Sequence, residues 1–130
     1  MSFSRLLAVL SLLVLVAAPA LAAPPRNISA AEAAQLLQRE KRVYLLDVRT
    51  PGEFMQMRLD GAHLIPIDQI LRRIGELPKD RPILVYCAVG SRSSQVAGYL
   101  AQQGYDEVYN LYGGISAWQL RGYPVLQGAP

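Results

Sequence analysis

The sequence predicts an α/β fold in which a parallel β-sheet is covered by helices on both faces. Three segments of strand length that are rich in apolar residues, at 43–48, 83–86 and 107–111, alternate with segments that have helical apolar periodicity. Continuous apolar runs are typical of parallel strands buried on both sides, and their alternation with helices predicts a three-layer domain. The sequence shows no internal repeat or low-complexity segment, so we expect one domain.

The first half of the domain should begin with a helix. Ser29 and Glu32 have the spacing of a capping box, which predicts a helix over about residues 30–40 before the strand at 43–48. Pro51 suits the first position of a short helix or turn. Residues 61–66 predict a short strand that ends at a proline.

The second half repeats the alternation of helix and strand. A helix should begin near Asp68 and end at Gly75, ahead of the strand at 83–86. The next helix should begin near Ser93 and end at Gly104, followed by the strand at 107–111. Two glycines at 113 and 114 precede a last helix, and residues from 122 onward should be coil.

The first 22 residues have the features of a secretory signal peptide. Arg5 supplies a positive charge, residues 6–18 form an apolar core, and residues 20–22 read Ala-Leu-Ala, an A-x-A cleavage pattern. The core is short for a membrane span, although an uncleaved anchor is the alternative. Cleavage of residues 1–22 would leave 108 of the 130 residues: a tether at 23–27, the domain at 28–123 and a tail at 124–130.

The charge of the chain gives little indication of a nucleic-acid or membrane partner. The formal net charge is +3, and Arg5 is the one charged residue of the predicted leader, so the processed chain would carry +2. The single histidine, His63, cannot build a metal-ligand cluster, and we interpret it as an exposed bystander. Tyr86 and Trp118 are expected to pack in the core.

Cys87 is the only cysteine, and it follows the strand at 83–86 directly. A lone cysteine in an exported protein is a reactive thiol, an intermolecular partner or a buried, inert side chain. Here a strand, a tight loop and a helix start should direct backbone N–H groups and the positive helix end toward the sulfur. We therefore predict a nucleophilic Cys87 at the base of an anion-binding loop.

The predicted loop closes on a permanent positive charge, because arginine stays protonated at working pH. Gly90 permits backbone angles that other residues resist. The loop residues are Ala88, Val89, Gly90, Ser91 and Arg92. Asp47 and Arg49, at the end of another strand, are candidate supporting residues; we interpret them mainly as structural, with Arg49 paired to Glu53.

These residues resemble the rhodanese family of sulfurtransferases. Residues 87–92 have the six-residue length of the family's catalytic loop, and residues 46–54, 61–66 and 113–118 fit three further motifs in order and spacing. The resemblance extends over about residues 28–123. It implies the rhodanese-like three-layer fold, and with the leader it implies the small, single-domain, exported bacterial type, located in the periplasm.

The resemblance also implies a mechanism. The Cys87 thiolate would take a sulfane sulfur from thiosulfate or a similar donor, forming a persulfide that the loop N–H groups stabilise. The persulfide would pass its sulfur to cyanide or to a thiol, including the thiol of another protein. This chemistry needs no metal and no organic cofactor.

Two positions depart from the family's pattern. Ala88 and Val89 are apolar where many thiosulfate-specialised members carry basic residues, so the donor stays open. Residues 57–59 read Met-Arg-Leu where the family often reads Gly-His-Ile. Arg58 is then either a positive charge near the mouth of the site or, as we prefer, a solvated surface arginine.

Two other functions share parts of this pattern. Cysteine phosphatases also use a cysteine–arginine loop, but with five intervening residues where this loop has four. A persulfide carrier or partner-binding module that does not turn over would have the same loop residues. The presence of Cys87 argues against a purely binding role, and a sulfurtransferase is the leading interpretation.

Overall fold

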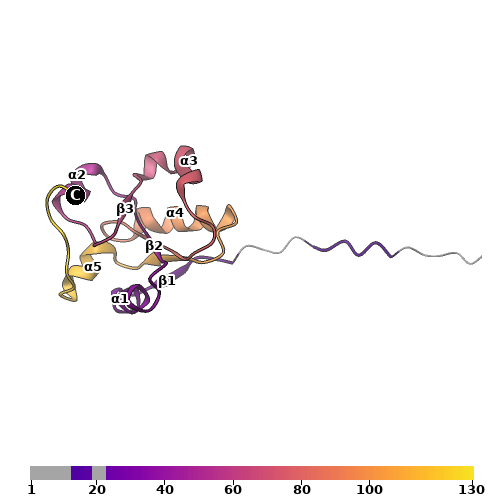
Figure 1. The fold of residues 1–130 in the computed structure, drawn as a ribbon, viewed down its shortest axis with the longest axis horizontal. Coiled ribbons are helices and arrows are strands. Elements are labelled where there is room, and N and C mark those ends of the chain that lie inside the picture. Colours follow the sequence, from indigo (N-terminus) through magenta and orange to yellow (C-terminus); the bar gives the residue numbers. More distant parts are fainter. Residues whose placement is uncertain (1–12, 19–22) are drawn as a thin grey trace, which may run out of the picture.

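A five-stranded parallel sheet forms the centre of the domain (Figure 1). This computed structural model describes residues 13–18 and 23–130. The strands are β1 (Arg26–Ile28), β2 (Tyr44–Asp47), β3 (His63–Leu64), β4 (Ile83–Tyr86) and β5 (Val108–Leu111). They lie in the order β1-β5-β4-β2-β3, and each neighbouring pair is parallel. The predicted α/β class with a parallel sheet is confirmed.

Helices cover both faces of this sheet, as the sequence predicts (Figure 1). The helices are α1 (Ala30–Arg39), α2 (Pro51–Gln56), α3 (Ile70–Arg73), α4 (Ser91–Gln102) and α5 (Gly114–Leu120). Side chains of α3 and α4 pack with Val85 on one face, whereas those of α1 and α5 pack with Leu84 on the other. Because neighbouring strand residues point to opposite faces, one strand serves both cores.

Local sequence signals explain where two of the helices begin. The Ser29 hydroxyl accepts from Glu32 N at 3.1 Å, and the Glu32 carboxylate accepts from Ser29 N at 3.2 Å. Thr50 and Glu53 make the same capping box at the start of α2, with Pro51 at the first helical position. Both boxes stabilise a helix start by pairing free N–H groups.

Two segments that the sequence suggested to be linkers take part in the domain. Arg26 and Asn27, assigned to the tether at 23–27, belong to β1 and pair with β5. The tail at 124–130 has no helix, as predicted, yet Leu126 forms an antiparallel bridge with Arg58. A strand of three residues with polar members gives no apolar run, and for this reason β1 was not predicted.

The predicted helix from Asp68 to Gly75 is broken into short pieces. α3 is flanked by 3-10 turns at Ile67–Gln69 and Ile74–Glu76. Residues 13–18 of the predicted leader are exposed and have no regular structure, and the rest of the leader lies outside the described residues. Among the described residues, no helix is long and apolar enough to cross a membrane.

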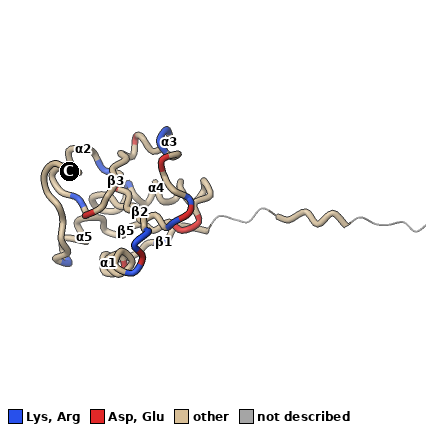
Figure 2. The backbone as a smooth tube through the Cα atoms, viewed as in Figure 1, with Lys and Arg blue, Asp and Glu red and all other residues tan. Residues whose placement is uncertain are grey.

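Charged residues of both signs are interspersed along the tube in the view of Figure 2. This mixture agrees with the small net charge of +3. It gives no indication of a face built to attract polyanions.

Candidate active site

Cys87 lies where β4 ends, inside a loop that leads directly into α4. The helix begins at Ser91, two residues earlier than predicted, so Ser91 and Arg92 belong to its first turn. Cys87 is fully buried, with 0% of its surface exposed. Of the predicted loop residues, Gly90 donates to the sulfur, and the next helical residue, Ser93, which was not predicted as a site residue, donates to it as well.

Three hydrogen-bond donors contact the Cys87 sulfur. Gly90 N lies 3.1 Å from Sγ, Ser93 N lies 3.4 Å away, and the Ser93 hydroxyl lies 3.3 Å away. Burial by itself would raise the pKa of the thiol, but these donors, with the Val89 N–H, lower it below its ordinary value. The loop therefore favours the thiolate, as the sequence predicts.

Glycines bring the loop close to the start of α5. Gly90 has φ 102°, and a Cβ there would lie 3.1 Å from Gly113 N. A Cβ at Gly114 would lie 2.5 Å from Cys87 O and from Ala88 O. This contact lets Ile115 N donate to Cys87 O at 2.9 Å and Ser116 N donate to Ala88 O at 3.1 Å. The segment at 113–118 thus supports the loop from behind.

Arg92 is held by Glu53 from α2. Its two terminal nitrogens donate to the two carboxylate oxygens at 2.8 and 2.9 Å. This pairing lowers the pKa of Glu53 to about 2. The sequence interpretation paired Glu53 with Arg49, which is wrong. Both nitrogens of the Arg92 fork bind Glu53, so the residue anchors the loop as well as adding positive charge.

Asp47 and Arg49 form a buried ion pair with each other. Arg49 Nη2 lies 2.8 Å from Asp47 Oδ2, and it also donates to Met57 O at 2.6 Å. Tyr86 packs in the sheet as expected, and its hydroxyl accepts from Leu59 N at 3.1 Å. These contacts fix the chain between α2 and β3, which agrees with the structural interpretation of both residues.

Arg58 is buried, with 6% of its surface exposed, so the interpretation as a solvated surface arginine is wrong. Its guanidinium lies over the Phe54 ring and donates to Phe54 O and Gly128 O. The residue therefore joins α2 to the C-terminal tail. These are contacts of a positioning side chain rather than of a charge at the mouth of the site.

The remaining singled-out residues lie where the sequence suggested. His63 is exposed and stacks on Tyr44, with the ring centroids 4.3 Å apart. Trp118 is buried in the core with α1 and α5 and donates to Pro124 O. Residues 13–18 and 23–130 contain no group of three or more histidine, cysteine, aspartate or glutamate side chains that could hold a metal.

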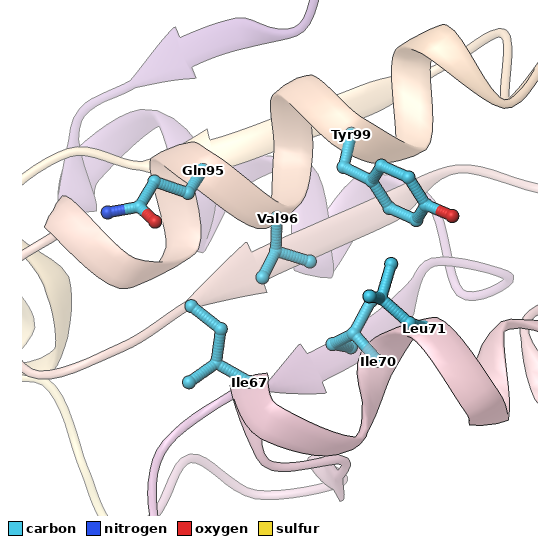
Figure 3. A pocket seen from close by; sticks show the side chains of 6 residues that line it. All are labelled: Ile67, Ile70, Leu71, Gln95, Val96 and Tyr99. Carbon is cyan, nitrogen blue, oxygen red and sulfur yellow. The ribbon is translucent and has the colours of Figure 1, made fainter.

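An apolar cavity of about 140 Å³ lies between α4 and the segment around α3 (Figure 3). Ile67, Ile70 and Leu71 face Val96 and Tyr99 across it. The loop at 87–92 contributes no side chain to this cavity. The arrangement around the thiol is therefore a site distinct from it.

Sequence reasoning missed two residues of the site. Ser93 was treated only as the start of a helix, although a hydroxyl one turn after a loop cysteine can return to its sulfur. Glu53 was assigned to the wrong arginine because Arg49 is nearer in sequence, whereas Arg92 is 39 residues away. A contact of that separation has no local sequence signal.

The chain has relatives among known proteins. Residues 29–121 match the family described as rhodanese-like domain. The chain belongs to that family. The rhodanese-related protein from Thermoplasma volcanium, known from a crystal structure, has a TM-score of 0.71 and 34% identity, covering 78% of this chain and 97% of that one.

Relatives with named activities come from the same family. A protein named "Sulfurtransferase" from Allochromatium vinosum is 42% identical over 100 residues, which cover 77% of this chain and 94% of the relative. "Thiosulfate sulfurtransferase GlpE" from Shewanella oneidensis is 40% identical over 86 residues, which cover 65% and 85%. These relatives support a rhodanese sulfurtransferase family for this chain.

Proposed function

We propose that this protein transfers sulfane sulfur through a persulfide formed on Cys87. The observation that carries the proposal is the ring of donors around the sulfur, from Gly90 N, Ser93 N and Ser93 Oγ. Donors aimed at one buried sulfur stabilise a negative charge there, both on the thiolate and on a persulfide. A thiolate of lowered pKa is the form that attacks sulfur.

The first half-reaction uses thiosulfate or a similar donor. The Cys87 thiolate attacks the outer sulfur of thiosulfate, a new S–S bond forms, and the donor's S–S bond breaks. Its electron pair leaves with sulfite, so Cys87 retains an anionic persulfide. Hydrogen bonds from α5 to the carbonyls of residues 87 and 88 hold the base of the loop.

The second half-reaction returns the enzyme to its starting state. Cyanide or a thiolate attacks the outer sulfur of the persulfide, and the electron pair of the breaking S–S bond returns to Cys87 Sγ. Glu53 and Arg92 keep the first turn of α4 in place while the charge on the sulfur changes.

Access to the sulfur requires movement of the loop rim. Cys87 exposes 0% of its surface, so a donor cannot touch Sγ in this arrangement. Val89 of this loop is 63% exposed, so displacing its side chain would cost little packing. Because Val89 is apolar, it adds no charge that would favour thiosulfate, and the class of the sulfur donor stays open. Thiosulfate is the donor to test first.

Replacing Cys87 by serine tests the proposal. The unmodified chain should form thiocyanate from thiosulfate and cyanide, and its intact mass should rise by about 32 Da after thiosulfate treatment, as expected for a covalent sulfur intermediate. Cys87→Ser should lose both signals while keeping its circular dichroism spectrum. Thiocyanate formation by Cys87→Ser at the parent rate would contradict the mechanism.

We also propose that the protein is exported, on the strength of the apolar leader with its A-x-A pattern at residues 20–22. The intact mass of protein from the exported fraction should correspond to cleavage before Ala23. A full-length mass in a membrane fraction would instead support the uncleaved anchor.

A further inference from the structure

The C-terminal tail is bonded to the end of α2. Arg58 and Leu126 exchange two backbone hydrogen bonds, of 2.9 Å from Arg58 N and 2.8 Å from Leu126 N. Gly128 N donates to Met55 O, in the last turn of α2, at 2.8 Å. In Figure 1 the yellow tail runs from α5 to the neighbourhood of α2, where the C-terminus lies. Residues 125–128, which we call the strap, thus hold α2 from the side of its last turn.

The Arg58 side chain adds to this attachment. Its Nη1 donates to Phe54 O at 3.3 Å and also to Gly128 O, and its Cζ lies 5.1 Å from the centre of the Phe54 ring. Both side chains are buried, so these bonds are shielded from water. The last carbonyls of a helix have no partner within it. Arg58 and the strap therefore supply donors that the end of α2 lacks.

α2 is too short to hold its position by itself. A helix of six residues is marginal in water, and its place in a fold depends on tertiary contacts. The capping box between Thr50 and Glu53 fixes the first turn internally, but it does not tie the helix to the rest of the domain. The strap ties the last turn to the tail, so it helps to determine where the side chains of α2 lie.

Glu53 transmits the position of α2 to the loop around Cys87. Its two carboxylate oxygens hold the terminal nitrogens of Arg92 at 2.8 and 2.9 Å. Arg92 lies between Gly90 and Ser93, whose backbone N–H groups donate to the sulfur. Because one short stretch of backbone joins these residues, displacing Arg92 disturbs the donors. The sulfur is fully covered, so the same displacement would also help to uncover it.

We infer that Arg58 and the strap position the active-site loop through α2 and Glu53 and hold it closed over Cys87. The inference rests on the proposed function, because it assigns positioning residues to the same site. The strap bonds are lost when α2 moves away from the tail, so they oppose the movement that opens the loop. Arg58 acts through Glu53 and takes no part in the sulfur chemistry itself.

Access to the sulfur can be measured without sulfur transfer. Iodoacetamide alkylates Cys87, the only cysteine, and intact mass gives the rate at a pH above the midpoint of thiolate formation. Arg58→Met removes the side-chain donor, and Leu126→Pro removes a backbone donor of the strap. Loss of one neutral hydrogen bond changes an equilibrium by about two- to tenfold, and the rate should rise by a factor in this range. A smaller rise in both variants would overturn the inference.

Two controls separate positioning from general loss of stability. Ala129→Pro places the same substitution just beyond the strap, where the N–H makes no backbone hydrogen bond to the described residues, and should leave the rate unchanged. Arg58→Lys keeps a donor for Gly128 O and should recover part of the protection. Urea unfolding gives the fraction of globally unfolded chain in each variant. Alkylation that rises only as much as this fraction would overturn the inference, and so would equal effects of Ala129→Pro and Leu126→Pro.

Amide hydrogen exchange follows the loop itself. In the folded Leu126→Pro protein, the backbone amides of Gly90 and Ser93 should exchange faster than in the unmodified chain, because these N–H groups donate to the sulfur only while the loop is closed. Ala129→Pro should leave both exchange rates unchanged. Unchanged exchange at both amides in Leu126→Pro would show that the strap does not act on the loop.

A double substitution tests the route through Glu53. Glu53→Gln removes the charge that holds Arg92, so adding Leu126→Pro should then raise the alkylation rate by a smaller factor than it does in the unmodified chain. Equal factors in the two backgrounds would overturn this route. A chain that forms no thiocyanate but shows the strap effect would refute the proposed function alone. Thiocyanate formation without any strap effect would refute the inference alone.

Discussion

Ser93→Ala should make the Cys87 thiol less acidic, and this change isolates one of the three donors around the sulfur. The Ser93 hydroxyl lies 3.3 Å from Sγ, and the Ser93 backbone N–H contact at 3.4 Å survives the substitution. The single proton of this hydroxyl can go to Sγ or to Gly90 O at 3.2 Å, and it turns to the sulfur when the sulfur is a charged thiolate. Gly90 O keeps its bond from Ser94 N at 3.0 Å in either case. The substitution therefore removes a donor to the sulfur without orphaning a carbonyl.

The size of the effect follows from the charge of the acceptor. A hydrogen bond to a charged group contributes about 1.5–3 kcal/mol, and one pKa unit corresponds to about 1.4 kcal/mol. Loss of the donor should raise the pKa of Cys87 by about one to two units. The sign is fixed because the hydroxyl stabilises the thiolate more than the thiol.

The assay exploits the fact that Cys87 is the only cysteine of the chain. The rate of alkylation by iodoacetamide, followed by intact mass from pH 5 to 10, gives the midpoint of thiolate formation. Ser116→Ala is the matched control, because Ser116 is exposed and supports the loop through its backbone N–H. Equal midpoints for the unmodified chain and Ser93→Ala would refute the role of this hydroxyl.

Three further substitutions test the support of the loop. Glu53→Gln should lower the free energy of unfolding by about 1 kcal/mol or less at pH 7. Because the pKa of Glu53 is lowered from 4.5 to about 2, this loss, measured by urea unfolding, should shrink as the pH falls from 4.5 to 2. An equal loss at pH 7 and pH 2.5 would contradict the pairing with Arg92. Gly114→Ala should destabilise the protein by about 2–4 kcal/mol, since the new Cβ would lie 2.5 Å from the loop backbone. Gly98→Ala in α4 is the control, because a Cβ there meets nothing within 4 Å; it should be neutral or stabilise the protein by up to about 1 kcal/mol. Arg58→Met removes the bonds from the guanidinium to Phe54 O and Gly128 O, so the C-terminal tail should detach from α2 more often. Proteolysis after residue 123 should then be faster. An unchanged cleavage rate would show that these two bonds do not hold the tail.

Sequence alone predicted most of the architecture because the strong elements have local signals. Strands β2, β4 and β5 are rich in apolar residues, and α1 has a capping box at Ser29. Strand β1 has no such signal, since Arg26 and Asn27 are exposed polar residues that pair only because β5 is beside them. Edge strands of this kind are defined by tertiary contact, and propensity cannot identify them.

The site shows the same division between local and distant information. Cys87, Gly90 and Arg92 could be predicted because the loop is continuous in sequence. Their supports could not: Glu53 reaches Arg92 from 39 residues away, and Arg58 is buried only because Phe54 and the tail cover it. Sequence proximity favoured a pair between Arg49 and Glu53, but a closer carboxylate, Asp47, binds Arg49 in the fold.

The loop is held from three sides, and this explains how it tolerates apolar residues at positions 88 and 89. The start of α5 binds the carbonyls of Cys87 and Ala88, Glu53 binds Arg92, and the first turn of α4 supplies Ser93. Stabilisation of the sulfur therefore depends on backbone and on Ser93, which a change of the side chain at 88 or 89 leaves in place.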